Sequence, residues 1–187
     1  MAAIKLVPGR ECGECAVCCV AIGIDKPEIQ KPSGLACRHL CEAGCSIHET
    51  RPPVCRGFYC GWRLLGDLDE SWRPDRSGVM IEPELLDNVT GLSLMLVGNP
   101  LKTVRQPWFI DFVAIQVTRN LPLTLTLPGP VGHQGAKSLL NTKQMREAAA
   151  TSRGKVKELL EIALKRLTRY DFQPHAMQHS GNDVSPA

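Results

Sequence analysis

Hydrophobic and polar positions change character near residue 78 of this chain. Before it, apolar residues are scattered among cysteine, glycine and proline; beyond it, they follow regular periods. Residues 78–83 and 91–98 form short apolar runs, and residues 122–128 alternate strictly between apolar and polar. Such runs are typical of β-strands. The pattern therefore predicts a small sheet in the second part of the chain.

Two longer segments in the same part predict helices. In residues 106–120, Pro107 stands at the second position, which suits a first helical turn. Trp108, Phe112, Ile115 and Arg119 follow at helical spacing. The last element is expected to start near Asn141, with Gln144 at capping-box spacing, and to break or kink at Gly154. Its second half carries one apolar stripe: Val156, Leu159, Leu160, Ala163 and Leu167.

The first part of the chain gives weaker local signals. Residues 20–24 alternate with small residues and predict a short strand or a buried segment. Cys37, Cys41 and Cys45 are spaced by four and would share one face of a helix, although Gly44 argues against a helix that reaches Cys45. Residues 66–78 are polar and contain proline, so we expect them to be a boundary.

These signals predict an α+β protein with two parts. Residues 1–75 form an irregular, metal-organised module, the cysteine cluster. Residues 76–172 form a small α/β region, with a sheet of roughly three or four strands and two helices. Residues 173–187 are polar and are expected to be a disordered tail.

Length and composition fit a soluble protein. The chain has 187 residues, of which 43% are hydrophobic, and a formal net charge of +3. No basic run supports nucleic-acid binding, and no stretch approaches the ~18–20 apolar residues of a membrane span. The first residues lack the apolar core of a signal peptide. We therefore expect a cytoplasmic location and neither nucleic acid nor membrane as a partner, and the sequence leaves the protein partner unknown.

All nine cysteines fall between residues 12 and 60, and all nine are candidate metal ligands. The first four stand in the run C-G-E-C-A-V-C-C, which contains two successive C-x2-C steps. Thiolates select zinc, copper(I) or iron–sulfur clusters, and zinc and iron–sulfur sites both use the C-x2-C step. The predicted ligands are Cys12, Cys15, Cys18, Cys19, Cys37, Cys41, Cys45, Cys55 and Cys60.

Ligand arithmetic leaves the kind of site open. Four ligands complete a zinc site or a [4Fe–4S] cluster, so nine cysteines allow two sites and one spare, or one larger centre. In extended backbone Cys18 and Cys19 would point opposite ways and serve two centres; in a turn both would approach one. A disulfide framework is the weaker alternative, because disulfides seldom persist in the cytoplasm and nine is an odd number.

The cysteine pattern resembles the YkgJ-type family, described as zinc- or iron-chelating. The likeness covers residues 12–62, about a third of the chain. It implies a metal held by Cys12, Cys15, Cys18, Cys19, Cys37, Cys45 and Cys55. It also draws attention to Arg51, Pro52 and Arg56, which match family positions. His48 replaces the family's aromatic residue, and Cys41 and Cys60 lie outside the pattern. Flagellin lysine methylases are similar only in having such a cluster.

Neighbouring residues raise further alternatives. Arg51 and Arg56 flank Cys55 and would either donate to sulfur or form surface ion pairs with Glu42 or Glu49. His39 and His48 are possible but less favoured ligands. Phe58, Tyr59 and Trp62 are expected to pack under the site and exclude water.

Other chemistry has little support. The stretch after residue 128 lacks the order of a phosphate loop, because Ala136 separates Gly135 from Lys137; we expect a strand-to-helix loop there. No catalytic residue is predicted. The sequence thus favours a metal-binding protein that uses zinc or an iron–sulfur cluster. An iron–sulfur-dependent redox protein or enzyme, and a structural zinc interaction module, are the alternatives.

Overall fold

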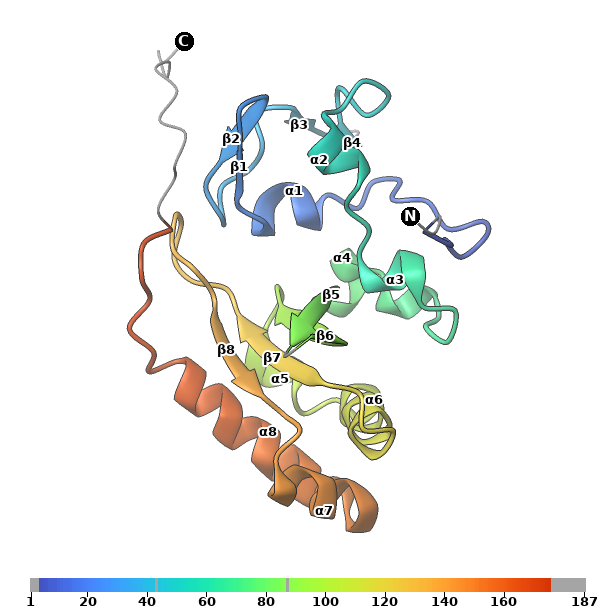
Figure 1. Cartoon of the computed structure of the whole chain (residues 1–187), viewed down its shortest axis with the longest axis vertical. Coiled ribbons are helices and arrows are strands. Elements are labelled where there is room, and N and C mark those ends of the chain that lie inside the picture. Colours follow the sequence, from blue (N-terminus) through green and yellow to red (C-terminus); the bar gives the residue numbers. More distant parts are fainter. Residues whose placement is uncertain (1–3, 43, 87, 176–187) are drawn as a thin grey trace.

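The structure is a computed structural model that describes residues 4–42, 44–86 and 88–175. An irregular region rich in cysteine precedes a sheet covered by helices (Figure 1). We call residues 12–60 the cysteine module. Helices and strands occur together along the chain, so the predicted α+β class is confirmed.

The cysteine module contains two short hairpins and two short helices. Strands β1 and β2 pair antiparallel, as do β3 and β4. The bounds are α1 Val17–Ala21, β1 Ile24–Lys26, β2 Ile29–Lys31, β3 Leu40–Cys41, β4 Gly44–Cys45 and α2 Pro53–Arg56. Cys41 and Cys45 lie in strands β3 and β4 rather than in the helix considered for Cys37, Cys41 and Cys45, which agrees with the argument from Gly44. Gly44 has a φ of 104°, a left-handed conformation that glycine tolerates and that ends any helix.

The segment expected to be a polar linker is instead folded onto the sheet. It follows α3 (Gly61–Leu64) and contains a 3-10 helix, Glu70–Trp72, and α4 (Pro74–Ser77). Leu68 and Trp72 are buried in the main hydrophobic core, because the turns between them direct their side chains inward. Arg10 donates to the carbonyl oxygens of Trp62, Leu65 and Leu68, which ties the start of the chain to this segment.

Four strands form the main sheet, in the order β5-β6-β7-β8. The bounds are β5 Val79–Leu86, β6 Val89–Leu96, β7 Leu123–Leu127 and β8 Ala136–Leu139. Only the central pair, β6 and β7, is parallel among these neighbours. The crossover between them carries α5 (Pro100–Thr103) and α6 (Pro107–Thr118). Three strands of this sheet, β5, β6 and β7, were predicted from the sequence, and β8 was not.

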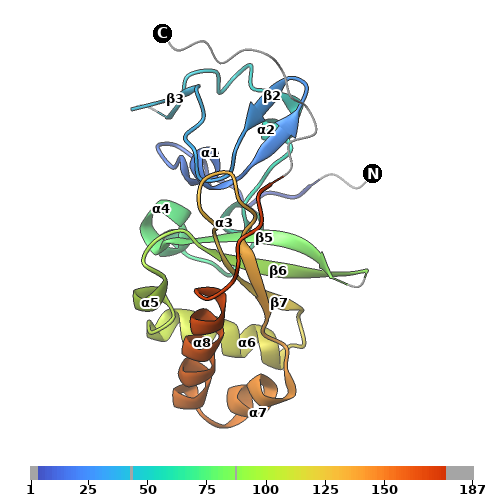
Figure 2. The ribbon, with the colours of Figure 1, turned by 90° about the vertical axis from the view of Figure 1, so that its left-hand side faces the viewer.

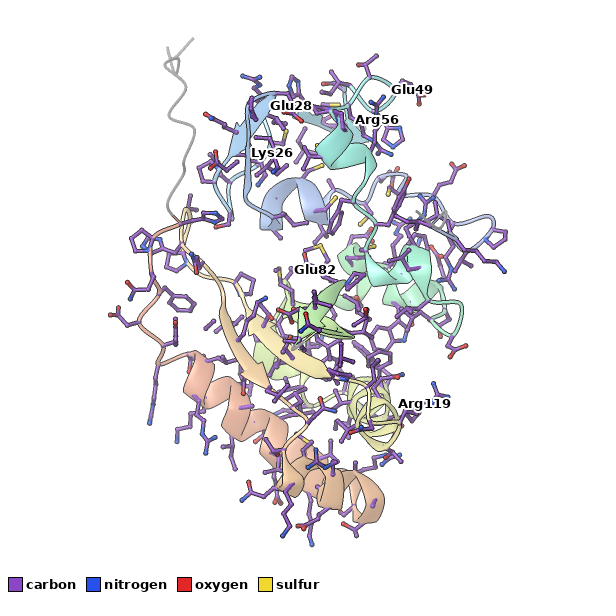
Figure 3. The ribbon with its side chains drawn as sticks, viewed as in Figure 1. Lys26, Glu28, Glu49, Arg56, Glu82 and Arg119 are labelled. Carbon is purple, nitrogen blue, oxygen red and sulfur yellow. The ribbon has the colours of Figure 1, made fainter. Side chains whose placement is uncertain are left out.

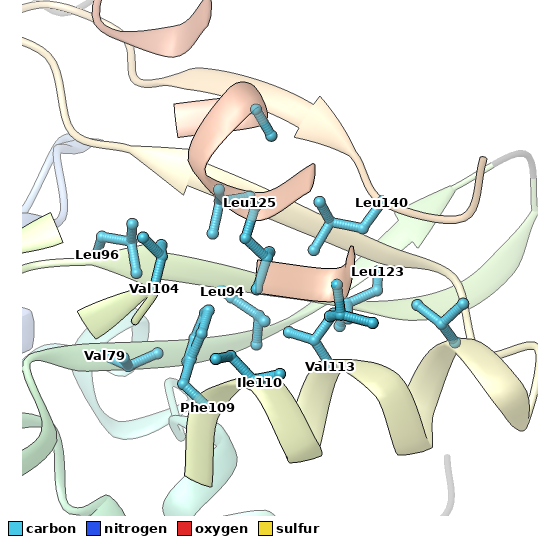
Figure 4. Close-up of a cluster of buried hydrophobic side chains, with 14 of the residues drawn as sticks. Val79, Leu94, Leu96, Val104, Phe109, Ile110, Val113, Leu123, Leu125 and Leu140 are labelled. Atoms are coloured by element: carbon cyan, nitrogen blue, oxygen red, sulfur yellow. The ribbon is translucent and has the colours of Figure 1, made fainter. Parts of the chain in front are cut away.

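One face of this sheet makes the core with the long helices (Figure 4). Pairing of Ile81 with Leu94, and of Leu94 with Leu125, places apolar side chains in rows across the strands. Phe109 of α6 packs against this face and is fully buried. The opposite face carries Met80 and Met95 beside polar side chains. There, Ser93 and Thr126 share a 2.7 Å hydrogen bond between their hydroxyl oxygens.

The predicted helix over 106–120 is confirmed, but its buried face differs from the spacing that suggested it. Trp108 and Ile115 are 36% and 43% exposed. The buried residues are Phe109, Ile110, Val113, Ala114 and Val117. This helix carries apolar residues on nearly every side, so its sequence alone does not indicate which side packs against the sheet.

The last predicted helix is two helices, α7 (Lys143–Thr151) and α8 (Arg153–Leu167). The expected break at Gly154 is wrong: the chain turns at Ser152, whose side chain caps α8 by accepting from Lys155 N. Thr142 rather than Asn141 caps α7. The apolar stripe on α8 is confirmed, with Val156 and Leu160 fully buried.

The stretch after residue 128 joins two strands, so the expected strand-to-helix loop is wrong. The backbone of this stretch also forms hydrogen bonds with part of the predicted disordered tail. Gln134 N donates to Gln173 O at 2.9 Å, and His175 N donates to Gly132 O at 2.8 Å. Residues 173–175 are therefore ordered against this loop, and residues 176–187 of the predicted tail lie outside the described residues.

The cysteine module lies beyond the sheet, on the opposite side from α7 and the body of α8 (Figure 2). Gly61 of α3 packs directly on Ile81 of β5, so closely that a Cβ atom there would lie 2.6 Å from the Ile81 side chain. None of the helices in the described parts of the chain is long and apolar enough to cross a membrane.

Candidate metal centre

The first four cysteines lie on one turn and the short helix that follows it. Cys15 N donates to Cys12 O at 2.9 Å, and Gly13 with a φ of 52° allows this tight C-x2-C turn. Cys18 and Cys19 both lie in α1. Neighbouring helical residues point about 100° apart, so their side chains diverge without facing opposite ways.

The later cysteines reach the same region from other segments. Cys37 N donates to Cys19 O at 2.9 Å, which holds Cys37 beside α1. Cys45 lies in β4 and Cys55 in α2. Yellow sulfur atoms gather around α1 and α2 in Figure 3. All nine cysteines are free thiols in this structure.

An outer cavity of about 220 Å³ opens between α1, the hairpins and α2. Seven cysteines line it: Cys12, Cys15, Cys18, Cys19, Cys37, Cys45 and Cys55. These are the seven that the family resemblance singled out. Lys31, His39, His48 and Arg51 also line this outer cavity.

An inner cavity of about 60 Å³ lies between the cysteine module and the sheet. Its cysteines are Cys12, Cys15, Cys18, Cys55 and Cys60. Arg51, Trp62 and Arg63 also line it, together with Met80 of β5. The inner cavity therefore brings Cys60 to the thiols of the first C-x2-C turn.

Cys41 is separated from the other eight cysteines. Its side chain is exposed, and its sulfur donates to Gly44 O at 3.3 Å within its own hairpin. It lines neither the outer nor the inner cavity. The alternating side-chain directions of a β-hairpin explain this, because Cys41 pairs with Gly44 while its neighbour Leu40 pairs with Cys45.

Hydrogen bonding and burial shift the pKa values of the thiols in opposite directions, down for Cys19 and up for other cysteines of the module. A hydrogen bond with Cys18 lowers the pKa of the Cys19 thiol to about 6, with the charges of Lys31 and Arg51 acting in the same direction. The same bond, followed by burial, raises the pKa of Cys18. Burial also raises the pKa of Cys15, Cys55 and Cys60.

Lys31 places a buried positive charge beside these thiols. Its side chain is 3% exposed, and its ammonium donates to the carbonyl oxygens of Val20 at 2.9 Å, Pro32 at 3.0 Å and Leu35 at 2.7 Å. Desolvation lowers its pKa, while Cys37, Cys19 and Cys18 oppose that shift. Sequence reasoning missed this residue, because a single lysine in a polar hairpin gives no signal of burial.

Two arginines lie close to sulfur, and a third does not. Arg63 Nη1 donates to Cys12 Sγ at 3.8 Å, and Arg51 lines both cavities. Arg56 is exposed on α2 (Figure 3). Of the two arginines that flank Cys55, only Arg51 is therefore placed to interact with the thiols. Arg63 was not anticipated.

The two histidines and the aromatic group are less central. His48 is half exposed, with Nδ1 at 3.4 Å from Glu49 Oε1, and His39 Nε2 accepts from Arg38 at 3.2 Å. A ligand role for either remains a prediction. Phe58 lines both cavities, whereas Tyr59 and Trp62 line the inner one, as a packing role would require.

Thiol chemistry in these cavities fits a soft metal, but the sulfur atoms do not form a finished ligand set. Within residues 4–42, 44–86 and 88–175, no three or more Cys, His, Asp or Glu side chains are grouped so that they could hold a metal ion as placed. The identity of the ligands and of the metal therefore remains a prediction.

Comparisons with known proteins add no assignment. No family model, no curated protein and no solved structure matches the chain.

Proposed function

We propose that this chain is a metal-binding protein that holds its metal through clustered cysteine thiolates. One observation carries the proposal: seven unpaired cysteines, drawn from several separate segments between residues 12 and 55, line one cavity of about 220 Å³. Zinc and an iron–sulfur cluster are the two cofactor alternatives, because both take thiolate ligands. Metal ions are the partners that this arrangement supports.

The weak core of the cysteine module supports a structural contribution from the metal. Among the described residues between 4 and 60, Ile29 is the single apolar side chain that is buried. So little apolar burial does not offset the entropy of ordering such a segment. Free energy from metal–thiolate bonds supplies the difference in small metal-organised modules.

The resemblance to the YkgJ-type family supports the same proposal. Its seven cysteines coincide with the seven that line the outer cavity. A reducing compartment keeps thiols available for metal, so the proposal includes a cytoplasmic location.

A second candidate, an iron–sulfur redox protein or enzyme, is favoured by the positive groups near sulfur. Arg63 donates to Cys12 Sγ, and Arg51 lines both cavities. Hydrogen bonds and positive charge at cluster sulfurs tune reduction potentials. An interaction module with purely structural zinc would not need such groups, although they would also offset the negative charge of zinc thiolates.

Elemental analysis and visible absorption test the proposal on full-length protein purified without air and without an affinity metal. Iron with acid-labile sulfide and a brown colour would support the cluster alternative, and a reversible redox titration would then favour the redox protein. Colourless protein containing zinc would support the zinc alternative. The proposal fails if reduced protein binds neither added zinc nor a cluster assembled from iron and sulfide.

A further inference from the structure

We propose that the inner cavity binds one small tetrahedral oxyanion, of the size of sulfate or phosphate. Its donors are the N–H groups of Arg51 Nε, Trp62 Nε1 and Arg63 Nε. This inference goes beyond the proposed function, because it depends on nitrogen donors of the cavity and not on which thiols bind metal.

Three buried donors of the inner cavity have no acceptor. Among the described residues, the buried side-chain nitrogen and oxygen atoms without a hydrogen-bond partner are Arg51 Nε, Trp62 Nε1 and Arg63 Nε. All three residues line this cavity, and Trp62 is only 3% exposed. Buried N–H groups of folded proteins nearly always have a partner. Three open donors around one cavity therefore indicate a ligand that brings its own acceptor atoms.

The cysteine sulfurs around the cavity do not serve these donors as placed. Cys12 Sγ accepts from Arg63 Nη1 at 3.8 Å, which is a different nitrogen of the same guanidinium. Arg63 Nε stays without an acceptor. A thiol sulfur is in any case a weak acceptor, whereas an anionic oxygen forms short, charge-assisted hydrogen bonds with N–H groups. The open donors thus favour an oxyanion over the thiols.

Positive charge around the inner cavity also lacks a balancing carboxylate. Arg51 and Arg63 line it, and no Asp or Glu of the described residues does. Asp75 follows Pro74 of the lining, but Asp75 is paired with Arg73 at 2.7 Å. Charges removed from water are stable when they are paired. An anion in the cavity would supply the missing negative charge.

The size of the cavity and the number of donors limit the kind of anion. About 60 Å³ corresponds to roughly two water molecules at ~30 Å³ each, which admits one small ion and excludes a nucleotide. Guanidinium groups match oxyanions, because their planar forks fit two oxygens. Donors from three different side chains need several acceptor atoms, which a tetrahedral oxyanion presents and a halide does not.

The oxyanion site would join the cysteine module to the sheet region. Arg51 precedes α2, whereas Trp62 and Arg63 lie in α3. Helix α3 follows α2 and packs on β5 (Figure 1), and Met80 of β5 also lines the inner cavity. One anion held by both segments would therefore link the module to the sheet.

Nuclear magnetic resonance tests the proposal on full-length, reduced wild-type protein. Sulfate, phosphate and chloride are titrated separately at constant ionic strength, and ¹H–¹⁵N spectra follow the indole and arginine Nε–H signals. The Trp62 signal is the indole signal that Trp62→Phe lacks. We expect sulfate or phosphate to shift it with single-site saturation, while the indole signals of Trp72 and Trp108 stay in place. A response to one oxyanion and not the other would identify the ligand.

Charge-removing variants test the donors one at a time. Arg51→Gln and Arg63→Gln should each weaken oxyanion binding about tenfold or more, because each removes a charge-assisted hydrogen bond. Arg56→Gln is the matched control, since Arg56 is exposed on α2, and it should keep the wild-type affinity. Wild-type affinity in both Arg51→Gln and Arg63→Gln would overturn the assignment. If a variant fails to fold, the wild-type titration decides.

Other results of the wild-type titration would contradict the oxyanion site. These are the absence of a saturable shift with both oxyanions, a response to chloride alone, and equal shifts of every indole signal. If added Zn²⁺ shifts the Trp62 signal where neither oxyanion does, its donor belongs to metal-bound sulfur. Whether the thiols bind metal is decided separately by elemental analysis, so the two proposals fail independently.

Discussion

The cysteine module and the sheet region are stabilised by different means. Almost all buried apolar residues of the described chain lie from Trp62 onward. Before Trp62, the described residues contribute a single buried apolar residue, Ile29. The sheet region has strands of up to eight residues, and the module has strands of two or three. Apolar burial accounts for the order of the sheet region, so the module needs another source of stability.

That difference shows that apolar residues determine the structure of the sheet region, whereas polar groups and thiols determine that of the module. In the sheet region, hydrophobic period and strand register determine which side chains meet. In the module, polar backbone bonds hold the loops, as when Lys31 binds three carbonyl oxygens. The thiols face cavities within that frame, and a metal held by them as proposed would supply the free energy that burial does not.

The largest expected effect separates the two regions by removing metal. Treatment with a strong chelator under reducing conditions should abolish amide protection across residues 12–60 and leave most of β5–β8 and α6–α8 protected, because structural metal supplies much of the folding free energy of such modules. Hydrogen exchange with peptide-level mass spectrometry measures this. Unchanged protection in the module after complete metal removal would contradict the comparison.

Truncation of a buried core side chain should instead destabilise the sheet region. Phe109 is fully buried, so Phe109→Ala should lower the free energy of unfolding of the sheet region by about 3–5 kcal/mol. Denaturant unfolding monitored by helical circular dichroism measures the loss. Ile115→Ala on the same helix is the control, since Ile115 is 43% exposed and should change stability much less. Equal losses in both variants would show that the described core is misassigned.

Lys31 tests whether polar contacts frame the module. Lys31→Met should cost about 1–3 kcal/mol, because buried carbonyl oxygens lose their donor, and should increase hydrogen exchange over residues 20–37. Lys26→Met is the matched control, since Lys26 is exposed in the same hairpin. If both variants exchange like the wild type, the buried ammonium does not hold these loops.

The smallest effect concerns a polar cluster on the face of the sheet opposite the helices. Burial of Glu84 is outweighed by hydrogen bonds from Lys137 and Thr124, which lower its pKa. The resulting stabilisation is present above the ordinary glutamate pKa and is lost as the pH falls through the lowered value. Glu84→Gln should therefore cost about 0.2–1 kcal/mol at neutral pH and nothing in strong acid.

Urea unfolding of wild type and Glu84→Gln, across a range of pH, measures that difference. Glu158→Gln, at an exposed position of α8, is the control and should match the wild type throughout. A Glu84→Gln difference that grows toward low pH would have the wrong sign.

Local sequence pattern predicted much of the sheet region. Strands near 79–86, 89–96 and 123–127 and the helix over 107–118 were expected from period and proline placement. β8 was missed because its four residues, Ala136–Leu139, are too short for a periodic signal. The break at Ser152 was missed because Gly154 is the stronger helix breaker by propensity, yet tertiary packing keeps it inside α8.

By itself, the sequence determined the α+β class, the periodic elements and the concentration of thiols between residues 12 and 60, because these depend on local residue order. Tertiary structure decided which thiols share a cavity, the separation of Cys41, and the burial of Lys31 and Trp72. Those features join segments far apart in the chain: Cys12 meets Arg63, and Cys60 shares the inner cavity with Met80 of the sheet. No local period encodes such contacts, since they arise only when separate elements pack together.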